Sequence, residues 1–180
     1  YTGLNDKPED KVVFNEIMYN PLTPDTEFIE LNNISRTVAF DLSGYELHGV
    51  NFTFPAGTII PPGGFSLAVK DLVAFTSKYG SGLPVAGEYN GKLDLDGETL
   101  TLERPSTSGN IVVDGVRYES VPPWPPLANG TDGSLQVLDP SKDTSRVGNW
   151  IAQGGVATPG NTNSVRTILT TFPQVWVNEL

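Results

Sequence analysis

The chain has 180 residues and a mass of 19.4 kDa, which suits one domain, or one domain and part of a neighbour, with a core that needs no disulfide or metal. Its 21 acidic and 11 basic residues give a formal charge of −10, which disfavours partners such as nucleic acid and acidic membranes. The absence of cysteine excludes disulfide frameworks, cysteine nucleophiles and thiolate metal centres. No apolar run approaches the roughly 20 residues of a membrane span, so we expect no membrane insertion.

Short stretches rich in β-branched and aromatic residues recur along the chain, and 19 glycines and 15 prolines punctuate them. They cover residues 12–19, 27–32, 45–47, 58–60, 66–69, 99–103, 111–113, 116–118 and 134–138. Short strands in this number are typical of a sandwich or barrel. In the second stretch Phe28 and Glu30 share one face, while Ile29 and Leu31 share the other. Because apolar residues occur on both faces, we expect both faces of this strand to be covered.

One stretch, residues 71–79, has the spacing of a helix. Leu72, Phe75 and Tyr79 fall on one face of such a helix. Asp71 can cap its N-terminus, and Gly80 can end it. We therefore expect one short helix between two strands.

The stretches at residues 111–113 and 116–118 are separated only by Asp114 and Gly115. Both residue types tolerate the positive φ angles that a two-residue turn requires. The sequence therefore predicts a tight β-hairpin centred on these two residues.

The hexapeptide VVFNEI at residues 12–17 recurs 163 residues later as VWVNEL at residues 175–180. A spacing of this size is that of a domain, so the match predicts a tandem array whose next repeat is cut off after its first strand. The alternative is that two apolar strands share Asn-Glu by chance. The predicted organisation is an N-terminal extension at residues 1–10, a β-sandwich domain at residues 11–163, and a linker with the first strand of a truncated repeat at residues 164–180.

A series of short motifs follows a defined order across residues 11–163. It includes Asn15-Glu16-Ile17, Glu27-Phe28-Ile29-Glu30-Leu31-Asn32-Asn33, Leu42-Ser43-Gly44-Tyr45, Asp96-Gly97-Glu98, Trp124-Pro125, Asp132-Gly133-Ser134-Leu135, Asn149-Trp150 and Thr158-Pro159-Gly160-Asn161. In this order the motifs resemble the lamin-tail domain family, in particular its secreted bacterial members.

The resemblance implies an all-β fold, an immunoglobulin-like antiparallel β-sandwich with one short helix, and no catalytic apparatus. It implies a structural, adhesive or protein-interaction module of a secreted or cell-surface multidomain protein. The expected partners are other domains of the same chain or surface proteins, with polysaccharide as a further class, and the expected location is extracellular or at the cell surface. No cofactor is implied.

The residues themselves also argue against an enzyme. His48 is the only histidine, and Ser66, within Gly64-Phe65-Ser66-Leu67-Ala68, begins a strand instead of joining a strand to a helix. Glycoside hydrolysis requires two carboxyl groups. The candidates are Glu16, Glu27, Glu30, Asp94, Asp96 and Glu98. Nothing in their spacing isolates one pair, so we predict that none is catalytic.

Two features keep a second hypothesis open, that of a glycan- or calcium-binding accessory domain attached to an enzyme. Asp94, Asp96 and Glu98 offer carboxylates for Ca²⁺, although they lack the ligand series of an EF-hand and also fit an ordinary acidic turn. Trp124, between two pairs of prolines, is a candidate platform for a sugar ring. The alternative is that Trp124 packs over the end of the sandwich.

Overall fold

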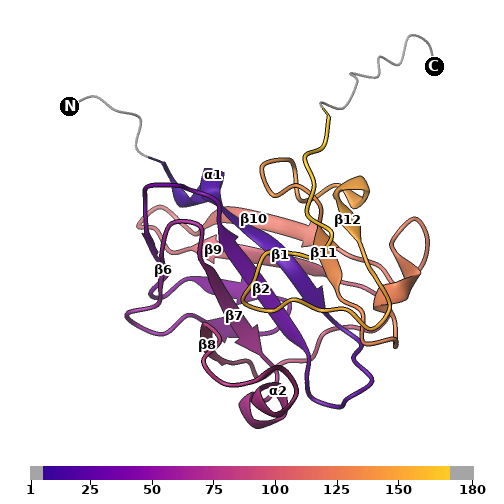
Figure 1. Ribbon diagram of the computed structural model, residues 1–180. Coiled ribbons are helices and arrows are strands. Elements are labelled where there is room, and N and C mark those ends of the chain that lie inside the picture. The colour runs from indigo at the N-terminus through magenta and orange to yellow at the C-terminus, as the bar shows by residue number, and fades with distance from the viewer. Residues whose placement is uncertain (1–5, 171–180) are drawn as a thin grey trace.

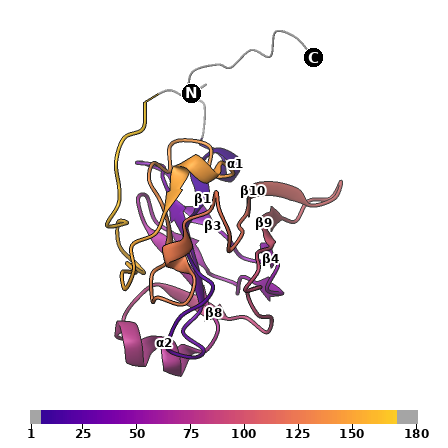
Figure 2. The ribbon, with the colours of Figure 1, turned by 90° about the vertical axis from the view of Figure 1, so that its right-hand side faces the viewer.

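The computed structural model describes residues 6–170, whose strands form three sheets (Figures 1 and 2). The six-stranded sheet has the order β12-β11-β1-β2-β7-β8, the four-stranded sheet has the order β10-β9-β4-β5, and β3 pairs with β6. The strands are β1 (Val12–Met18), β2 (Phe28–Asn33), β3 (Phe40–Asp41), β4 (Glu46–His48), β5 (Phe52–Thr53), β6 (Ile59–Ile60), β7 (Phe65–Val69), β8 (Val85–Glu88), β9 (Thr99–Arg104), β10 (Ile111–Arg117), β11 (Leu135–Val137) and β12 (Trp150–Ile151). The helices are α1 (Pro8–Lys11), α2 (Leu72–Tyr79) and the 3-10 turns η1 (Pro126–Ala128) and η2 (Val147–Asn149).

The two larger sheets pack face to face and enclose the main core. β1 and β2 contribute Phe14, Ile29 and Leu31, and the four-stranded sheet contributes Leu47 and Leu102, all of them buried. In Figure 2 the strands β4, β9 and β10 lie together on one side of β1. The predicted all-β sandwich is confirmed.

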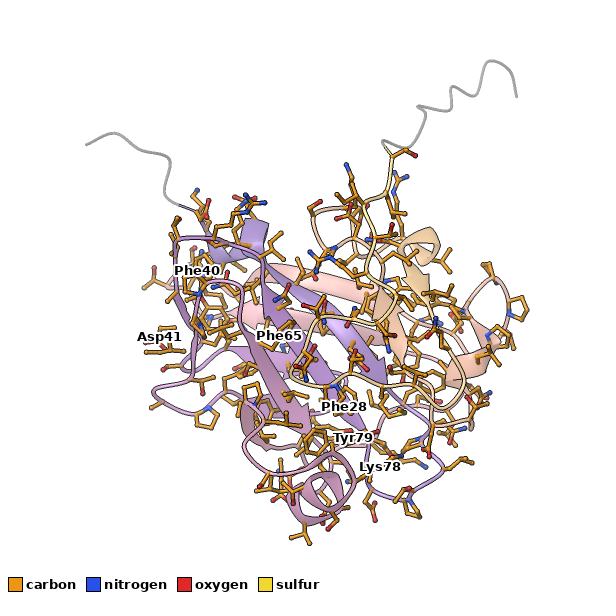
Figure 3. All side chains as sticks on the ribbon, in the orientation of Figure 1. Phe28, Phe40, Asp41, Phe65, Lys78 and Tyr79 are labelled. Atoms are coloured by element: carbon orange, nitrogen blue, oxygen red, sulfur yellow. The ribbon has the colours of Figure 1, made fainter. Side chains whose placement is uncertain are left out.

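The other face of the six-stranded sheet is covered as well, as the residues of β2 predicted. Phe28 packs edge-on against Phe75 and Tyr79 of α2, with ring centroids 5.7 and 5.6 Å away. Figure 3 labels Phe28 and Tyr79. Further along this face lie Glu16 and Glu30, which accept hydrogen bonds from residues 156–169, here called the strap. In Figure 1 the strap is the yellow segment that crosses in front of β1 and β2.

Helix α2 begins and ends as predicted. The Asp71 carboxylate accepts a hydrogen bond from Ala74 N at 2.7 Å, and Gly80 follows the last turn with φ +92°. The helix leads from β7 to β8, which run parallel because a crossover returns the chain to the same end of the sheet. The expectation of wholly antiparallel sheets was wrong for this pair. Within residues 6–170, no helix has the length and apolar character needed to cross a membrane.

The predicted hairpin at Asp114 and Gly115 was wrong. Both residues lie inside β10, a continuous strand that pairs with β9 and carries an irregularity between Val112 and Asp114. The Asp114 carboxylate accepts hydrogen bonds from Phe14 N at 2.8 Å and from Thr144 Oγ1 at 3.0 Å. These long-range hydrogen bonds hold Asp114 against β1 and against the loop that contains Thr144. They stabilise an extended backbone at Asp114 instead of a turn.

Contacts extend past both predicted boundaries of the β-sandwich domain. Before residue 11, Glu9 pairs with Arg104, with Oε1 and Nη2 2.5 Å apart. After residue 163, Leu169 N donates a hydrogen bond to Asp139 Oδ2 at 3.0 Å. The predicted repeat strand at residues 175–180 lies outside the described residues.

Candidate functional site

Two glutamates form a buried pair at the centre of the face beneath the strap. Glu16 of β1 and Glu30 of β2 are direct cross-strand partners, and neither residue has exposed surface. Both belong to the motifs quoted above and both were candidates for a hydrolytic pair. Their surroundings decide whether they can act on a substrate.

Every carboxylate oxygen of the pair accepts an internal hydrogen bond. Glu16 Oε1 accepts from Ser134 Oγ at 2.5 Å and from Thr158 N at 2.8 Å, while Oε2 accepts from Thr158 Oγ1 at 2.9 Å. Glu30 Oε1 accepts from Asn15 Nδ2 at 2.7 Å, and Oε2 accepts from Gly160 N. The pair therefore holds the strap against the sheet and presents no free oxygen to a substrate.

The electrostatics of the pair follow from its burial. Burial raises the pKa of Glu16, and it raises the pKa of Glu30 well above its ordinary range, with the negative charge of Glu16 adding to the effect. The hydrogen bonds from the strap and from Asn15 oppose this shift because they favour the ionised form. We therefore expect the pair to retain a proton at pH values where exposed glutamates are ionised.

The strap is fastened beyond the pair by amide side chains. Asn163 Nδ2 donates to the carbonyl oxygens of Asn15 and Val137, both at 2.9 Å. Gln136 Oε1 accepts from Ser164 N at 3.1 Å. These buried groups are satisfied by one another, so the motif around Asn15 and the strap are architectural.

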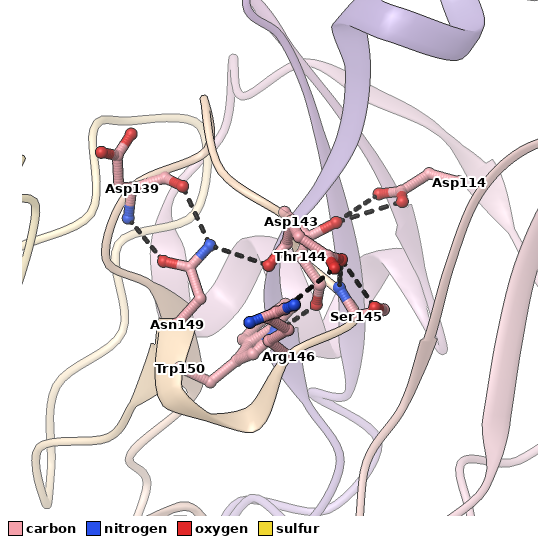
Figure 4. A network of polar contacts seen from close by, with 8 residues as sticks. All are labelled: Asp114, Asp139, Asp143, Thr144, Ser145, Arg146, Asn149 and Trp150. Carbon is pink, nitrogen blue, oxygen red and sulfur yellow. Dashed lines mark hydrogen bonds and ion pairs between the residues drawn. The ribbon is translucent and has the colours of Figure 1, made fainter. Parts of the chain in front are cut away.

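A second polar network fixes the loop between β11 and β12 (Figure 4). Asn149 accepts a hydrogen bond from Asp139 N and donates one to Asp139 O, both at 2.9 Å. Trp150 Nε1 donates to Thr144 O at 2.7 Å, and the Thr144 side chain donates to Asp114. The Asn149-Trp150 motif therefore ties this loop to β10.

We expect stability to depend on pH through Asp114. Burial raises the pKa of its carboxyl to about 6, above the value of about 3.9 in an unfolded chain. The folded protein thus holds a proton that the unfolded chain releases, so this contribution is fully present below pH of about 3.9 and is lost as pH rises through about 6. Urea unfolding measures this contribution at pH 4 and at pH 7. Between these two pH values the free energy of unfolding of the wild type should fall by on the order of 2 kcal/mol more than that of Asp114→Asn. Parallel pH dependences of the two proteins would contradict this assignment.

The remaining catalytic candidates are dispersed. Ser66 lies in β7 with its side chain buried, whereas His48 is on the four-stranded sheet. Glu27 accepts hydrogen bonds from Tyr89 Oη and Leu93 N, both at 3.2 Å. Between residues 6 and 170 these side chains form no nucleophile–base pair.

The calcium candidates bind their own loop. Glu98 Oε1 accepts from Asp94 N at 2.7 Å and from Tyr118 Oη at 3.1 Å, and Asp94 Oδ1 accepts from Asp96 N at 2.9 Å. Gly97, with φ +117°, closes the turn where a Cβ would lie 2.4 Å from the Tyr118 carbonyl oxygen. The arrangement is that of a hydrogen-bonded acidic turn, and the three carboxylates do not converge on one point among the described residues.

Trp124 does not form the exposed platform that a sugar would need. It is only 6% exposed, and its ring centroid lies 6.1 Å from that of Trp150. A hydrogen bond from Trp124 N to Val121 O, 3.1 Å long, turns the proline-rich stretch back toward the core. The packing interpretation of this residue is therefore correct.

A basic hollow of about 760 Å³, which no sequence pattern predicted, lies beside the strap. Its lining includes Lys11, Arg36 and Arg166, three of the 11 basic residues in a chain of net charge −10. Phe65, labelled in Figure 3, adds an apolar wall. No local motif could reveal this site, because residues from both ends of the chain meet there.

The packed sheets define this chain as a β-sandwich module of the immunoglobulin-like class. The family described as Lamin Tail Domain matches residues 5–120, and the chain belongs to this family. The resemblance to the lamin-tail domain family is thereby confirmed. No curated protein and no solved structure matches the chain. The strands β11 and β12, which complete the six-stranded sheet, lie beyond the matched residues, and so does the strap.

Proposed function

We propose that this chain is an interaction module of a secreted or cell-surface multidomain protein, with a structural, adhesive or protein-binding role and no catalytic activity of its own. The observation that carries the proposal is the basic hollow, a concave surface of a size typical of ligand sites. The extracellular or surface location is supported by the resemblance to secreted bacterial lamin-tail domains. The lack of catalysis is supported by the family. It is also supported by the buried carboxylates of Glu16 and Glu30, whose oxygens accept internal hydrogen bonds.

The proposed occupant is an acidic segment of a partner protein, either another domain of the same chain or a separate surface protein. Arg36 and Arg166 offer planar guanidinium groups that can bind carboxylates through two hydrogen bonds each. Lys11 also lines the hollow, with its Nζ 3.9 Å from Asp6 Oδ1, so the two arginines carry the charge argument, and Phe65 provides apolar contact. Because the rest of the chain is strongly acidic, an acidic segment is favoured at this hollow over other parts of the surface.

The alternative of a glycan- or calcium-binding accessory domain attached to an enzyme has less support. Its sugar platform, Trp124, is buried. Asp94 and Glu98, two of its three calcium candidates, accept hydrogen bonds from backbone groups of their own loop. We therefore propose the protein-binding role first.

The test is the binding of a fluorescent hexaglutamate peptide, followed by anisotropy at low salt. We expect Arg36→Glu combined with Arg166→Glu to weaken binding at least tenfold, and added salt to weaken binding to the wild type. Lys92→Glu combined with Arg117→Glu makes the same change of charge at exposed positions outside the hollow and should alter the Kd less than twofold. Equal losses in both double variants, or no binding to the wild type, would contradict the proposal.

A further inference from the structure

Three side chains of metal-ligating types meet on the outer face of the four-stranded sheet, and none of them belongs to the buried pair or to the basic hollow. Glu46 and His48 are two residues apart on β4 and therefore project from the same face. Glu103 of β9 lies directly opposite Glu46 in the antiparallel register. One ligand atom from each of the three residues lies within 4.8 Å of the other two.

The distances between these atoms fit a bound ion better than they fit direct hydrogen bonds. His48 Nε2 lies 3.4 Å from Glu46 Oε2 and 3.3 Å from Glu103 Oε2. These separations exceed the usual N–H···O length of about 2.9–3.0 Å. Around a tetrahedral zinc ion with bonds of about 2.0–2.1 Å, neighbouring ligand atoms are separated by roughly 3.3–3.4 Å. The imidazole is thus already spaced from each carboxylate as one zinc ligand is from another, and the two carboxylate oxygens lie within 4.8 Å of each other.

The charges favour a cation at the same point. Two glutamates directly opposite one another in an antiparallel pair repel and destabilise the sheet. Asn110 Nδ2 donates to Glu46 Oε2 at 3.2 Å and orients that carboxylate in the manner of an outer-shell ligand partner. The side chain of His48 is 49% exposed, so the cluster is open to solvent and water can complete the coordination.

We propose that Glu46, His48 and Glu103 form a binding site for a divalent transition-metal ion of the zinc class, with water in the remaining position. One imidazole and two carboxylates suit ions of intermediate softness, whereas Ca²⁺ requires six to eight oxygen ligands. The ion joins β4 to β9 and relieves the repulsion between the two glutamates. The site is independent of the proposed protein-binding role, since it shares no residue with the basic hollow.

The test exploits the single histidine of the chain. Zinc chloride is titrated calorimetrically into the untagged 180-residue protein at neutral pH, and the His48 ring resonances are followed by NMR with Co²⁺ as a paramagnetic probe. We expect one ion per chain and selective broadening of the His48 ring signals. His48→Gln and Glu103→Gln should each weaken zinc binding at least tenfold, and all variants should keep the circular dichroism spectrum of the wild type.

Asp96→Asn is the matched control, because it removes an exposed carboxylate from the loop between β8 and β9, outside the cluster. Its zinc affinity should stay within twofold of the wild type. Zinc binding that survives His48→Gln unchanged would overturn the proposal, since the ion would then sit on other carboxylates. Absence of binding at millimolar zinc would overturn it as well.

Discussion

Ending the chain after Gly155 is expected to abolish cooperative unfolding, whereas ending it after Gln174 should leave the melting temperature within about 2 °C. The first truncation removes the strap, whose Thr158 and Gly160 amides are donors to Glu16 and Glu30. The truncation removes these hydrogen bonds and uncovers this face of the sheet. A hydrogen bond to a charged group contributes about 1.5–3 kcal/mol, and the total stability of a domain is only about 5–15 kcal/mol. The second truncation removes residues that the repeat interpretation assigns to a following domain.

Differential scanning calorimetry measures both truncations, and a point substitution in the strap provides an independent check. Gly160 has φ +76°, and an added Cβ would lie 2.9 Å from Leu83 Cδ2. Gly160→Val should therefore lower the melting temperature without shortening the chain. A sharp transition at the wild-type temperature in the protein that ends at Gly155 would show that the strap is dispensable.

Replacing Glu16 by alanine should lower the free energy of unfolding by about 3 kcal/mol or more, equivalent to roughly 6–12 °C in melting temperature. The substitution leaves three donors without an acceptor, namely the Ser134 hydroxyl and both the amide and the hydroxyl of Thr158. Glu16→Gln keeps one acceptor oxygen, so its loss should be smaller. Urea unfolding at pH 7 measures the three proteins side by side.

Glu119→Ala is the control for this comparison, because it removes a carboxylate from a surface ion pair with Arg117. Such pairs contribute about 0–1 kcal/mol, so this variant should stay close to the wild type. A Glu16→Ala protein as stable as Glu119→Ala would contradict the conclusion that Glu16 holds the strap against the sheet. Enzymatic turnover by the wild type that is lost in a folded Glu16→Gln variant would contradict the assignment of Glu16 as structural.

Local patterns in the sequence were enough to establish much of the fold. The positions of most of the longer strands followed from β-branched residues between turn formers, and α2 followed from its spacing and from the caps Asp71 and Gly80. The strands β3, β5, β8 and β12 were not predicted, and β10 was predicted as two strands instead of one. The mixed faces of β2 predicted that the sheet is covered on both sides. These features depend on neighbours in the sequence, and the order of motifs added the family.

The roles of individual polar residues depended on partners distant in the chain, and only the tertiary structure decided them. Asp114 and Gly115 have the local chemistry of a turn, but contacts with Phe14 and Thr144 keep Asp114 within a strand. Glu16 serves as an acceptor for a strap 142 residues away. His48 meets Glu103 because β4 and β9 pair in one register. A carboxylate looks the same in the sequence whether it binds a backbone amide, a metal ion or water, and its neighbours in space determine which.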